Sequence, residues 1–457
     1  AKLRKKFLLY LGILLLFLSA IFLSYFRVLD NYELETLDIR YKLRPILPVN
    51  DDIVIIEVGD DTIDKIGKWP ISRRYHATLI DALMQAGAKA IIFDIFFSEE
   101  QNEEADAQFE EAIKKSGRVY LPHVFNIVQK GKKDVPVADR LQEEVLEKFK
   151  KYAKGIGFIN IIPDSDGKFR RVPPFIRYML GKKLKIPLDS DSNIIVNFPG
   201  PWNQTFRHYS YIDVIDSYIS TKFPLATGRK PIVDLESLKG SVCFVGVTAT
   251  ATPDAHPAPL DAMYPGVGVN ASLFNSFLLG KFIQRASRVT NVVILLFLCL
   301  ITSLIAKRAR TLFSFLFVFF FILGYIILVV AIFFLKGLWL DIFSSVTIIL
   351  FFYLGVTFAK YINEAYKIEL LEKELSIAKK IQESFLPKES PKISGIEIAA
   401  NMSTAQQVGG DLYDFVKIDD KKIGVMIGDV SGKGVPAALY MAKVVSEFKS
   451  YVAEELA

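Results

Sequence analysis

Cysteine is the scarcest residue in this chain of 457 residues, which contains only Cys243 and Cys299. Two cysteines in apolar stretches provide neither a disulfide framework nor a metal-binding cluster, and they leave the redox compartment open. A basic stripe with interleaved aromatic residues is also missing, and the net charge is only +6. We therefore expect no nucleic acid among the partners.

Charge is absent from three long apolar runs, residues 289–306, 312–335 and 342–359. Each run is about as long as a helix must be to cross ~30 Å of hydrocarbon. Lipid offers no hydrogen-bond partner to the backbone, so such runs must be helical. A buried bundle in a soluble protein is the alternative, but it rarely contains three such runs in succession. The sequence thus predicts an α-helical transmembrane bundle at residues 286–360, embedded in a lipid bilayer.

A fourth apolar run, residues 7–26, follows a basic N-terminus that contains Lys2, Arg4, Lys5 and Lys6. A secretory signal peptide would have a shorter apolar region and a small-residue cleavage site, whereas Tyr25-Phe26-Arg27 stands here. We therefore expect residues 1–29 to hold a retained transmembrane helix. The positive-inside rule places its basic end in the cytoplasm. Four spans then predict a multi-pass cell (inner) membrane protein with residues 30–285 extracellular or periplasmic.

Residues 30–285 have the pattern of a soluble α/β domain. Short β-branched runs alternate with helical segments, which favours parallel βαβ units. We expect strands at residues 53–58, 90–93, 119–121, 157–162, 194–198 and 241–247, and helices at residues 72–85, 99–115 and 267–279.

Several strings in this domain resemble the second class of CHASE domains, which are extracellular sensors of bacterial signalling proteins. They include residues 37–40, 67–73, 86–94, 238–247 and 265–271. Their order and spacing match over roughly 250 residues, and three membrane helices after the sensor also fit that family. Asn270 stands where a histidine is expected, and Gly268 replaces an acidic residue.

Candidate ligand-binding residues follow two of the predicted strands. Asp60, Asp61 and Asp94 lie just past strand ends, where open parallel sheets usually bind ligands. Arg73 is a further candidate, and Asp254 and His256 could join it. The alternative is that each aspartate only caps a helix or turn.

Residues 361–387 form a charged segment without glycine, and its proline, Pro387, ends it. Ile368, Leu371 and Leu375 begin a 3-4-3 apolar spacing, which favours a helical linker that forms a parallel coiled coil in a homodimer. A single amphipathic helix packed on its own domain is the alternative.

Two carboxylates mark a candidate metal site after residue 393. Glycines precede Asp411, and Asp429 ends an apolar strand before a glycine-rich turn. Carboxylates at the ends of adjacent strands suit magnesium or manganese. A phosphate-binding loop at Gly432-Lys433-Gly434 is the alternative, but the Walker spacing is absent. We expect strands at residues 396–400, 414–418 and 423–427, and a helix at residues 436–452.

The strings at residues 408–415 and 428–438 resemble metal-dependent serine/threonine phosphatases of type 2C, in the branch similar to the sporulation stage II protein E phosphatase. Residues 381–387 are similar to the helix that precedes the domain in that branch. The resemblance implies two divalent metal ions, with Asp411 and Asp429 as catalytic ligands and the Val430 carbonyl as a further ligand. Asp414 matches a motif position without a metal role, and Thr404 stands where proline is common.

The resemblance also implies a domain about three times longer than the stretch from Ile393 to Ala457. We therefore expect residues 388–457 to be the N-terminal part of a two-layer α/β sandwich, truncated and inactive as it stands. The whole sequence is interpreted as a bacterial receptor phosphatase, which dephosphorylates phosphoserine or phosphothreonine on a cytoplasmic regulator protein under control of an unknown extracellular ligand. A catalytically inert sensor and scaffold is the alternative.

Overall fold

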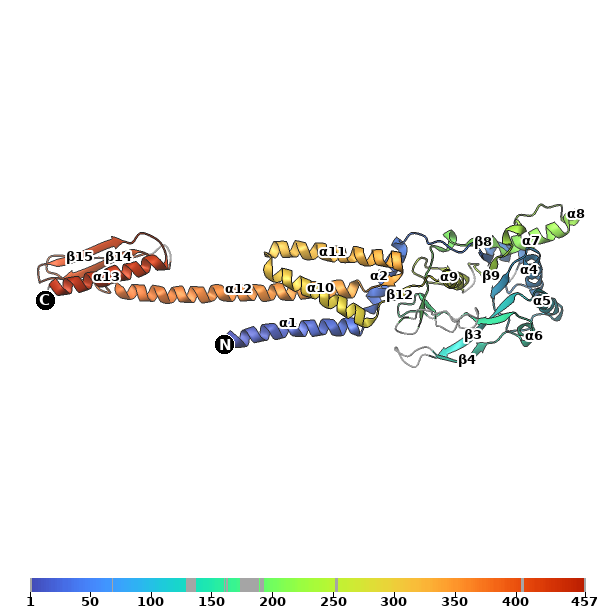
Figure 1. Cartoon of the computed structure of the whole chain (residues 1–457), viewed down its shortest axis with the longest axis horizontal. Coiled ribbons are helices and arrows are strands. Elements are labelled where there is room, and N and C mark those ends of the chain that lie inside the picture. The colour runs from blue at the N-terminus through green and yellow to red at the C-terminus, as the bar shows by residue number, and fades with distance from the viewer. Residues whose placement is uncertain are drawn as a thin grey trace. The chain divides into compact units, whose positions relative to one another are not determined.

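The computed structural model describes residues 2–67, 69–128, 137–159, 161, 163–172, 189, 193–250, 254–403 and 407–455. The chain divides into two compact units, Ala1–Tyr353 and Leu354–Ala457 (Figure 1). The first unit contains an α/β domain and a group of long apolar helices. The second contains most of a long helix followed by a β-hairpin and a final helix.

Three described helices are long and apolar enough to cross a membrane: α10 (Arg288–Arg308), α11 (Thr311–Lys336) and α12 (Phe343–Phe385). They correspond to the three charge-free runs. Helix α1 (Lys2–Tyr25) meets the same test only through Leu14–Tyr25 taken together with α2 (Asp30–Leu43), from which it is bent by 61°. The fourth span therefore stays a prediction.

A seven-stranded sheet forms the centre of the α/β domain, in the order β4-β3-β2-β9-β1-β8 with β5 also paired to β3. All its pairings are parallel except that of β3 with β4, which confirms the expected α/β class. The strands are β1 (Ile53–Val58), β2 (Ala90–Asp94), β3 (Val119–Val128), β4 (Val137–Glu143), β5 (Gly155–Phe158), β8 (Arg207–Ser210) and β9 (Val242–Val247).

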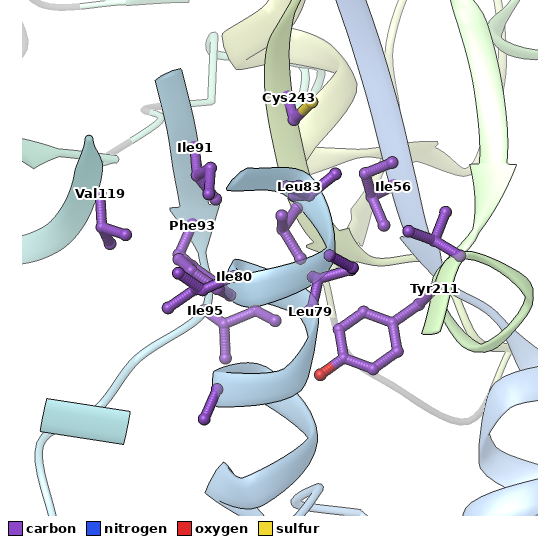
Figure 2. Packing of buried hydrophobic residues seen from close by; sticks show 14 of the residues in the cluster. Ile56, Leu79, Ile80, Leu83, Ile91, Phe93, Ile95, Val119, Tyr211 and Cys243 are labelled. Atoms are coloured by element: carbon purple, nitrogen blue, oxygen red, sulfur yellow. The ribbon is translucent and has the colours of Figure 1, made fainter. Parts of the chain in front are cut away.

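Helices cover both faces of this sheet. Ile53 and Ile55 of β1 pack toward α9 (Gly266–Leu279), whereas Ile56 packs on the other face against α4 (Arg73–Gln85) and α7 (Tyr211–Lys222) (Figure 2). Burial on both faces explains why β1 and β9 read as continuous apolar runs rather than alternating ones. The remaining helices of the domain are α3 (Asp60–Ile66), α5 (Glu103–Ser116), α6 (Glu147–Lys150) and α8 (Pro224–Thr227).

Several sequence-based boundaries were wrong. The helix expected from residue 99 begins at Glu103, because Asn102 caps it by accepting from the backbone N–H groups of Glu104 and Ala105. The strand expected at 194–198 is only β7 (Ile194–Ile195), which pairs with β6 (Arg171–Val172) outside the main sheet. The strand expected at 157–162 lies at Gly155–Phe158, with residues 160 and 162 outside the described part. Helices α2 and α7 and strand β8 were not predicted.

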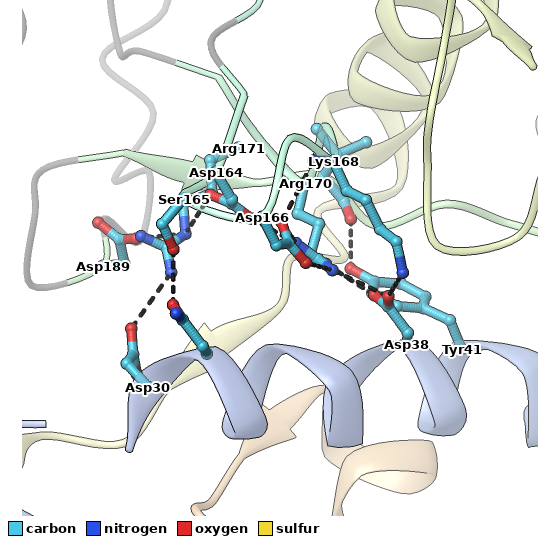
Figure 3. Close-up of polar contacts among 12 residues, drawn as sticks. Asp30, Asp38, Tyr41, Asp164, Ser165, Asp166, Lys168, Arg170, Arg171 and Asp189 are labelled. Carbon is cyan, nitrogen blue, oxygen red and sulfur yellow. Dashed lines mark hydrogen bonds and ion pairs between the residues drawn. The ribbon is translucent and has the colours of Figure 1, made fainter. Parts of the chain in front are cut away.

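Helix α2 is joined to the α/β domain by buried ion pairs. Arg170 is fully buried and binds both carboxylate oxygens of Asp38, at 2.7 and 2.8 Å, together with Asp164 and Asp166 (Figure 3). Lys168 also reaches Asp38, at 2.6 Å. All three nitrogens of this buried guanidinium therefore have carboxylate acceptors, which offsets the cost of burying its charge.

A second set of polar contacts joins α2 to the first turn of α12. The Glu33 carboxylate accepts from the backbone N–H groups of Ile342 and Ser344 at 3.0 and 2.7 Å. Buried Arg285 binds Asp30 and, at 3.1 Å, Asp341. It belongs to β12 (Gln284–Arg285), which pairs with β13 (Leu338–Trp339); the small strands β10 (Ala255–His256) and β11 (Tyr264–Pro265) also pair.

The second unit packs a β-hairpin against a helix. Strands β14 (Asp411–Lys417) and β15 (Ile423–Asp429) are antiparallel, and Leu412 packs against Met441 and Val445 of α13 (Val435–Glu455). The strand expected at 396–400 is wrong: only an isolated bridge joins Ile393 to Ile396, around a turn at Gly395. In the described part of this unit no third strand extends the hairpin.

Candidate functional site

A cavity of about 520 Å³ opens at the carboxyl ends of β2 and β9, in the α/β domain. Asp94 and Val247, the last residues of these strands, line it together with the start of α4 and the loop after β2. Ligands of open parallel sheets bind at this edge. Further lining residues are Trp69, Arg73, His76, Phe96, Glu99, Glu100, Gln101, Asp254 and His256.

Asp94 is the buried carboxylate of this cavity, with 8% of its surface exposed. Asn270 of α9 donates to its Oδ2 at 3.0 Å. Burial and the nearby Asp254 carboxylate raise the pKa of Asp94 to about 7, although Asn270 and His256 act in the opposite direction. Asp94 therefore changes charge near neutral pH.

The other buried polar side chains that line the cavity, Arg73 and His76, are already hydrogen-bonded to other parts of the protein. Arg73 binds Asp106 and the backbone carbonyl of Glu99. His76 is hydrogen-bonded to the Tyr211 hydroxyl at 2.8 Å, and burial lowers the pKa of His76 to about 3. Nothing in the sequence distinguished His76 from the apolar face of its helix.

The four candidate ligand-binding residues do not form one group. Arg73 and Asp94 line the cavity, and Asp254 and His256 join them. Asp60 and Asp61 do not line it. Asp60 instead binds the backbone N–H and hydroxyl of Thr250, which lowers its pKa, and Asp61 accepts from the Ser210 hydroxyl. Neither contact is the helix or turn cap that the alternative described, because Thr250 and Ser210 lie 190 and 149 residues away in the sequence.

Close packing explains one departure from the family pattern. A Cβ atom on Gly268 would lie 2.5 Å from the Trp202 ring and 2.7 Å from the Tyr264 ring, so an acidic side chain would not fit at this position. Asn270, two residues further along α9, supplies the amide that binds Asp94. The corner formed by this motif therefore contacts Asp94, which lines the cavity, while Asn270 itself does not line it.

In the second unit, Asp411 and Asp429 face each other across the hairpin. Asp411 is the first residue of β14 and Asp429 is the last residue of β15, and the two lie directly opposite each other in the antiparallel pairing. Both are exposed, and they line a hollow of about 480 Å³ with residues 401–403. The sequence therefore predicted correctly that the chain brings these two carboxylates together.

The backbone beside this pair fits a metal centre. A Cβ atom on Gly410 would lie 2.5 Å from the Val430 carbonyl oxygen and 3.3 Å from Asp429 Oδ1. Glycine therefore keeps the space beside these two oxygen atoms free. Two carboxylates and a carbonyl are oxygen ligands of the kind that magnesium and manganese prefer. Among the described residues, no group of three or more His, Cys, Asp or Glu side chains could hold a metal ion. The pair would therefore hold metal only with further ligands.

Two neighbouring side chains hold this region in place. The Gln382 amide, near the end of α12, donates to the Gly409 carbonyl at 2.7 Å and accepts from the Gly409 N–H at 3.2 Å. Asp414 is buried and lies 3.3 Å from Lys449 of α13. Asp414 thus faces the helix of its own domain, which is a structural role.

The structure thus combines an α/β domain that has a cavity at its strand ends, three described helices apolar enough to cross a membrane, and a two-carboxylate hairpin in a separate C-terminal unit. The CHASE2 domain model matches residues 12–306, and the chain belongs to this family. No solved structure gives a significant match.

The C-terminal unit has a second relationship. Residues 419–457 match the Stage II sporulation protein E (SpoIIE) model. The chain is 39% identical over 74 residues to "Phosphoserine phosphatase RsbU" of Bacillus subtilis and 40% identical over 68 residues to "Protein IcfG" of Synechocystis. These matches cover 16% and 15% of this chain and 22% and 11% of those relatives. The chain therefore spans less than a quarter of either relative.

We predict that Asp94→Asn stabilises the protein most strongly at alkaline pH. The folded-state pKa of Asp94 lies above its unfolded value, so native stability falls as pH rises between the two and stays low above pH 7. Asparagine cannot ionise, so it removes this loss of stability with rising pH, and it can keep the hydrogen bond from Asn270. The stability gain should grow by about 2–3 kcal/mol from pH 5 to pH 8. Thermal unfolding in detergent at both pH values measures it.

The matched control is Asp64→Asn, which removes an exposed carboxylate from the same end of the sheet. It should change stability equally at both pH values. A pH-independent effect of Asp94→Asn would contradict the raised pKa.

Proposed function

We propose that the protein is a membrane-bound sensor phosphatase. In this proposal the CHASE2 domain regulates metal-dependent hydrolysis of phosphoserine or phosphothreonine on a cytoplasmic regulator protein. The observation that carries it is the register pair Asp411 and Asp429, because Asp429 lies within the segment similar to SpoIIE and Asp411 lies opposite it. The relative named as a phosphoserine phosphatase adds support for the substrate class.

Asp411, Asp429 and the Val430 carbonyl would hold divalent metal, manganese or magnesium, with ligands from elsewhere. Such ions lower the pKa of a bound water and orient the phosphate for in-line attack. The protein's own contribution is geometric: the antiparallel register fixes one carboxylate opposite the other, and Gly410 keeps the space beside them free. Neither buried cysteine is needed as a nucleophile.

The test is phosphatase activity of the full-length protein, in nanodiscs with manganese and a phosphoserine peptide. Asp411→Ala and Asp429→Ala should each lower turnover by about 100-fold or more, because each removes a ligand from the metal centre. Asp420→Ala, which removes an exposed carboxylate from the hairpin turn, is the control and should leave turnover unchanged. Activity that survives loss of Asp429 would refute the assigned site. No activity with any divalent metal would favour the inert scaffold.

The proposed topology places residues 30–285 outside the cell and residues 361–457 inside. The basic N-terminus and the basic turn at Lys307–Arg310 support it, since both then face the cytoplasm. Single cysteines in place of Ala107 and Glu447, which are both exposed, should react with an impermeant maleimide from opposite sides of intact cells. Both native cysteines are buried, so background labelling should be low. Labelling of both positions from one side would rule out four spans.

The proposed dimer uses the part of α12 that follows the last span. Ile368 and Leu371 are exposed in the single chain, at 60% and 57% of their surfaces, and Ile377 and Ile381 are exposed as well. A parallel coiled coil would cover the seam of Ile368, Leu371 and Leu375. The uninterrupted helix from Phe343 to Phe385 would then transmit rotation toward Gln382.

Insertions near Glu372 test this linker. A helix turns about 100° per residue, so one inserted residue should rotate the output domain against the seam, and seven should nearly restore its phase. We expect phosphatase activity in membranes to vary periodically across insertions of one to seven residues. Equal activity for every length would mean that the helix is only a tether.

A further inference from the structure

Among the described residues that line it, the cavity at the carboxyl ends of β2 and β9 has an excess of negative charge. The positively charged side chain in this lining, Arg73, already binds Asp106 and the Glu99 carbonyl. The exposed carboxylate of Glu100 is likewise paired, with Lys148 at 3.0 Å. His76 is held uncharged by burial beside Tyr211. The carboxylates of Asp94 and Asp254 and the nearby Glu99 side chain remain, with His256 lying 3.7 Å from Asp254. The electrostatics therefore favour a positively charged occupant.

Asp94 is the group whose burial calls for a partner. It is more than nine-tenths buried and lines the cavity, and among the described residues only Asn270 donates a hydrogen bond to it, at Oδ2. An ionised carboxylate in this position is costly without a cation or further donors. Its raised pKa expresses the same cost. A cation that enters the cavity would offset this cost of ionising Asp94.

The walls of the cavity are apolar and partly aromatic. Trp69 and Phe96 are large rings that remain 39% and 38% exposed, and Ile95, Phe97 and Val247 complete the apolar lining. A ring face beside a carboxylate is a favourable environment for an ammonium group, through the cation–π interaction. A volume of about 520 Å³ lies within the range for small-molecule sites.

From these observations we propose that the cavity binds a small organic cation, an amine with an aromatic or aliphatic body, whose ammonium group contacts Asp94 and Asp254. The proposal gives the ligand class of the sensor and so rests on the proposed function. A bare metal ion fits less well, because no described group of three His, Cys, Asp or Glu side chains could hold one. An amine also uses the apolar wall, which a metal ion would leave unoccupied.

The experiment is calorimetric titration of the whole chain in nanodiscs at pH 8 with phenethylamine and with 2-phenylethanol, its uncharged counterpart. The amine should bind about tenfold or more tightly than the alcohol, because only the amine forms charged hydrogen bonds. Asp94→Asn should remove this preference and leave the weak binding of the alcohol unchanged. Below the pKa of Asp94, affinity for the amine should fall about tenfold per pH unit, since the carboxylate must lose its proton.

Asp64→Asn is the control and should bind the amine like the unmodified chain. If Asp94→Asn does not fold, Asp254→Asn replaces it, because the Asp254 side chain is 38% exposed and less important for folding. Equal binding of amine and alcohol, no amine binding at millimolar concentration, or an unchanged preference in a folded Asp94→Asn protein would each overturn the proposal. Binding is measured without a phosphatase assay, so its failure is distinguishable from failure of the proposed catalytic function.

Discussion

The buried guanidinium of Arg285 is the interaction on which the membrane-proximal structure depends. It lies between the carboxylates of Asp30 and Asp341 and stacks on Trp339, 4.1 Å from the ring centroid. Its side chain is 1% exposed, so each partner is needed: removing one member of a buried ion pair typically costs about 3–5 kcal/mol because the other charge remains buried. Three segments that are remote in sequence meet at this residue, namely the start of α2, the strand after α9 and the turn before α12.

Helix α2 connects the α/β domain to the long helix α12 through two opposed sets of contacts. Asp38 binds Arg170 and Lys168 on the side of the α/β domain, and Glu33 caps the first turn of α12. A carboxylate at this position also interacts favourably with the helix dipole. Because Asp38 and Glu33 belong to one helix, a displacement of the α/β domain relative to α12 would have to break one of the two sets. The helix thus contacts the α/β domain and the start of α12 directly.

The sequence predicted best those elements whose environment is uniform along their length. Strand β1 is buried on both faces and α11 is apolar throughout, so each reads as one continuous run. Helix α2 was missed because its charged residues gain partners only in the folded protein: Arg170 lies 132 residues from Asp38, and the backbone that Glu33 caps lies 311 residues away. The rule that ligands bind at strand ends indicated the edge of the sheet where the cavity lies, but it did not distinguish Asp94, which lines the cavity, from Asp60, which binds Thr250. That choice depends on the packing of α9 and the loop after β2.

The C-terminal carboxylates were predictable for a different reason. Asp411 and Asp429 are separated by a short hairpin, and a hairpin of this length brings the first residue of one strand opposite the last residue of the next. The pair of hydrogen bonds between the Gln382 side chain and the Gly409 backbone could not be predicted in the same way, since it depends on where α12 ends against the loop before β14. These two hydrogen bonds engage both backbone groups of Gly409, two residues before Asp411. The end of α12 therefore cannot shift along this loop without breaking both bonds, and the position of the helix end and the position of the first carboxylate are fixed together.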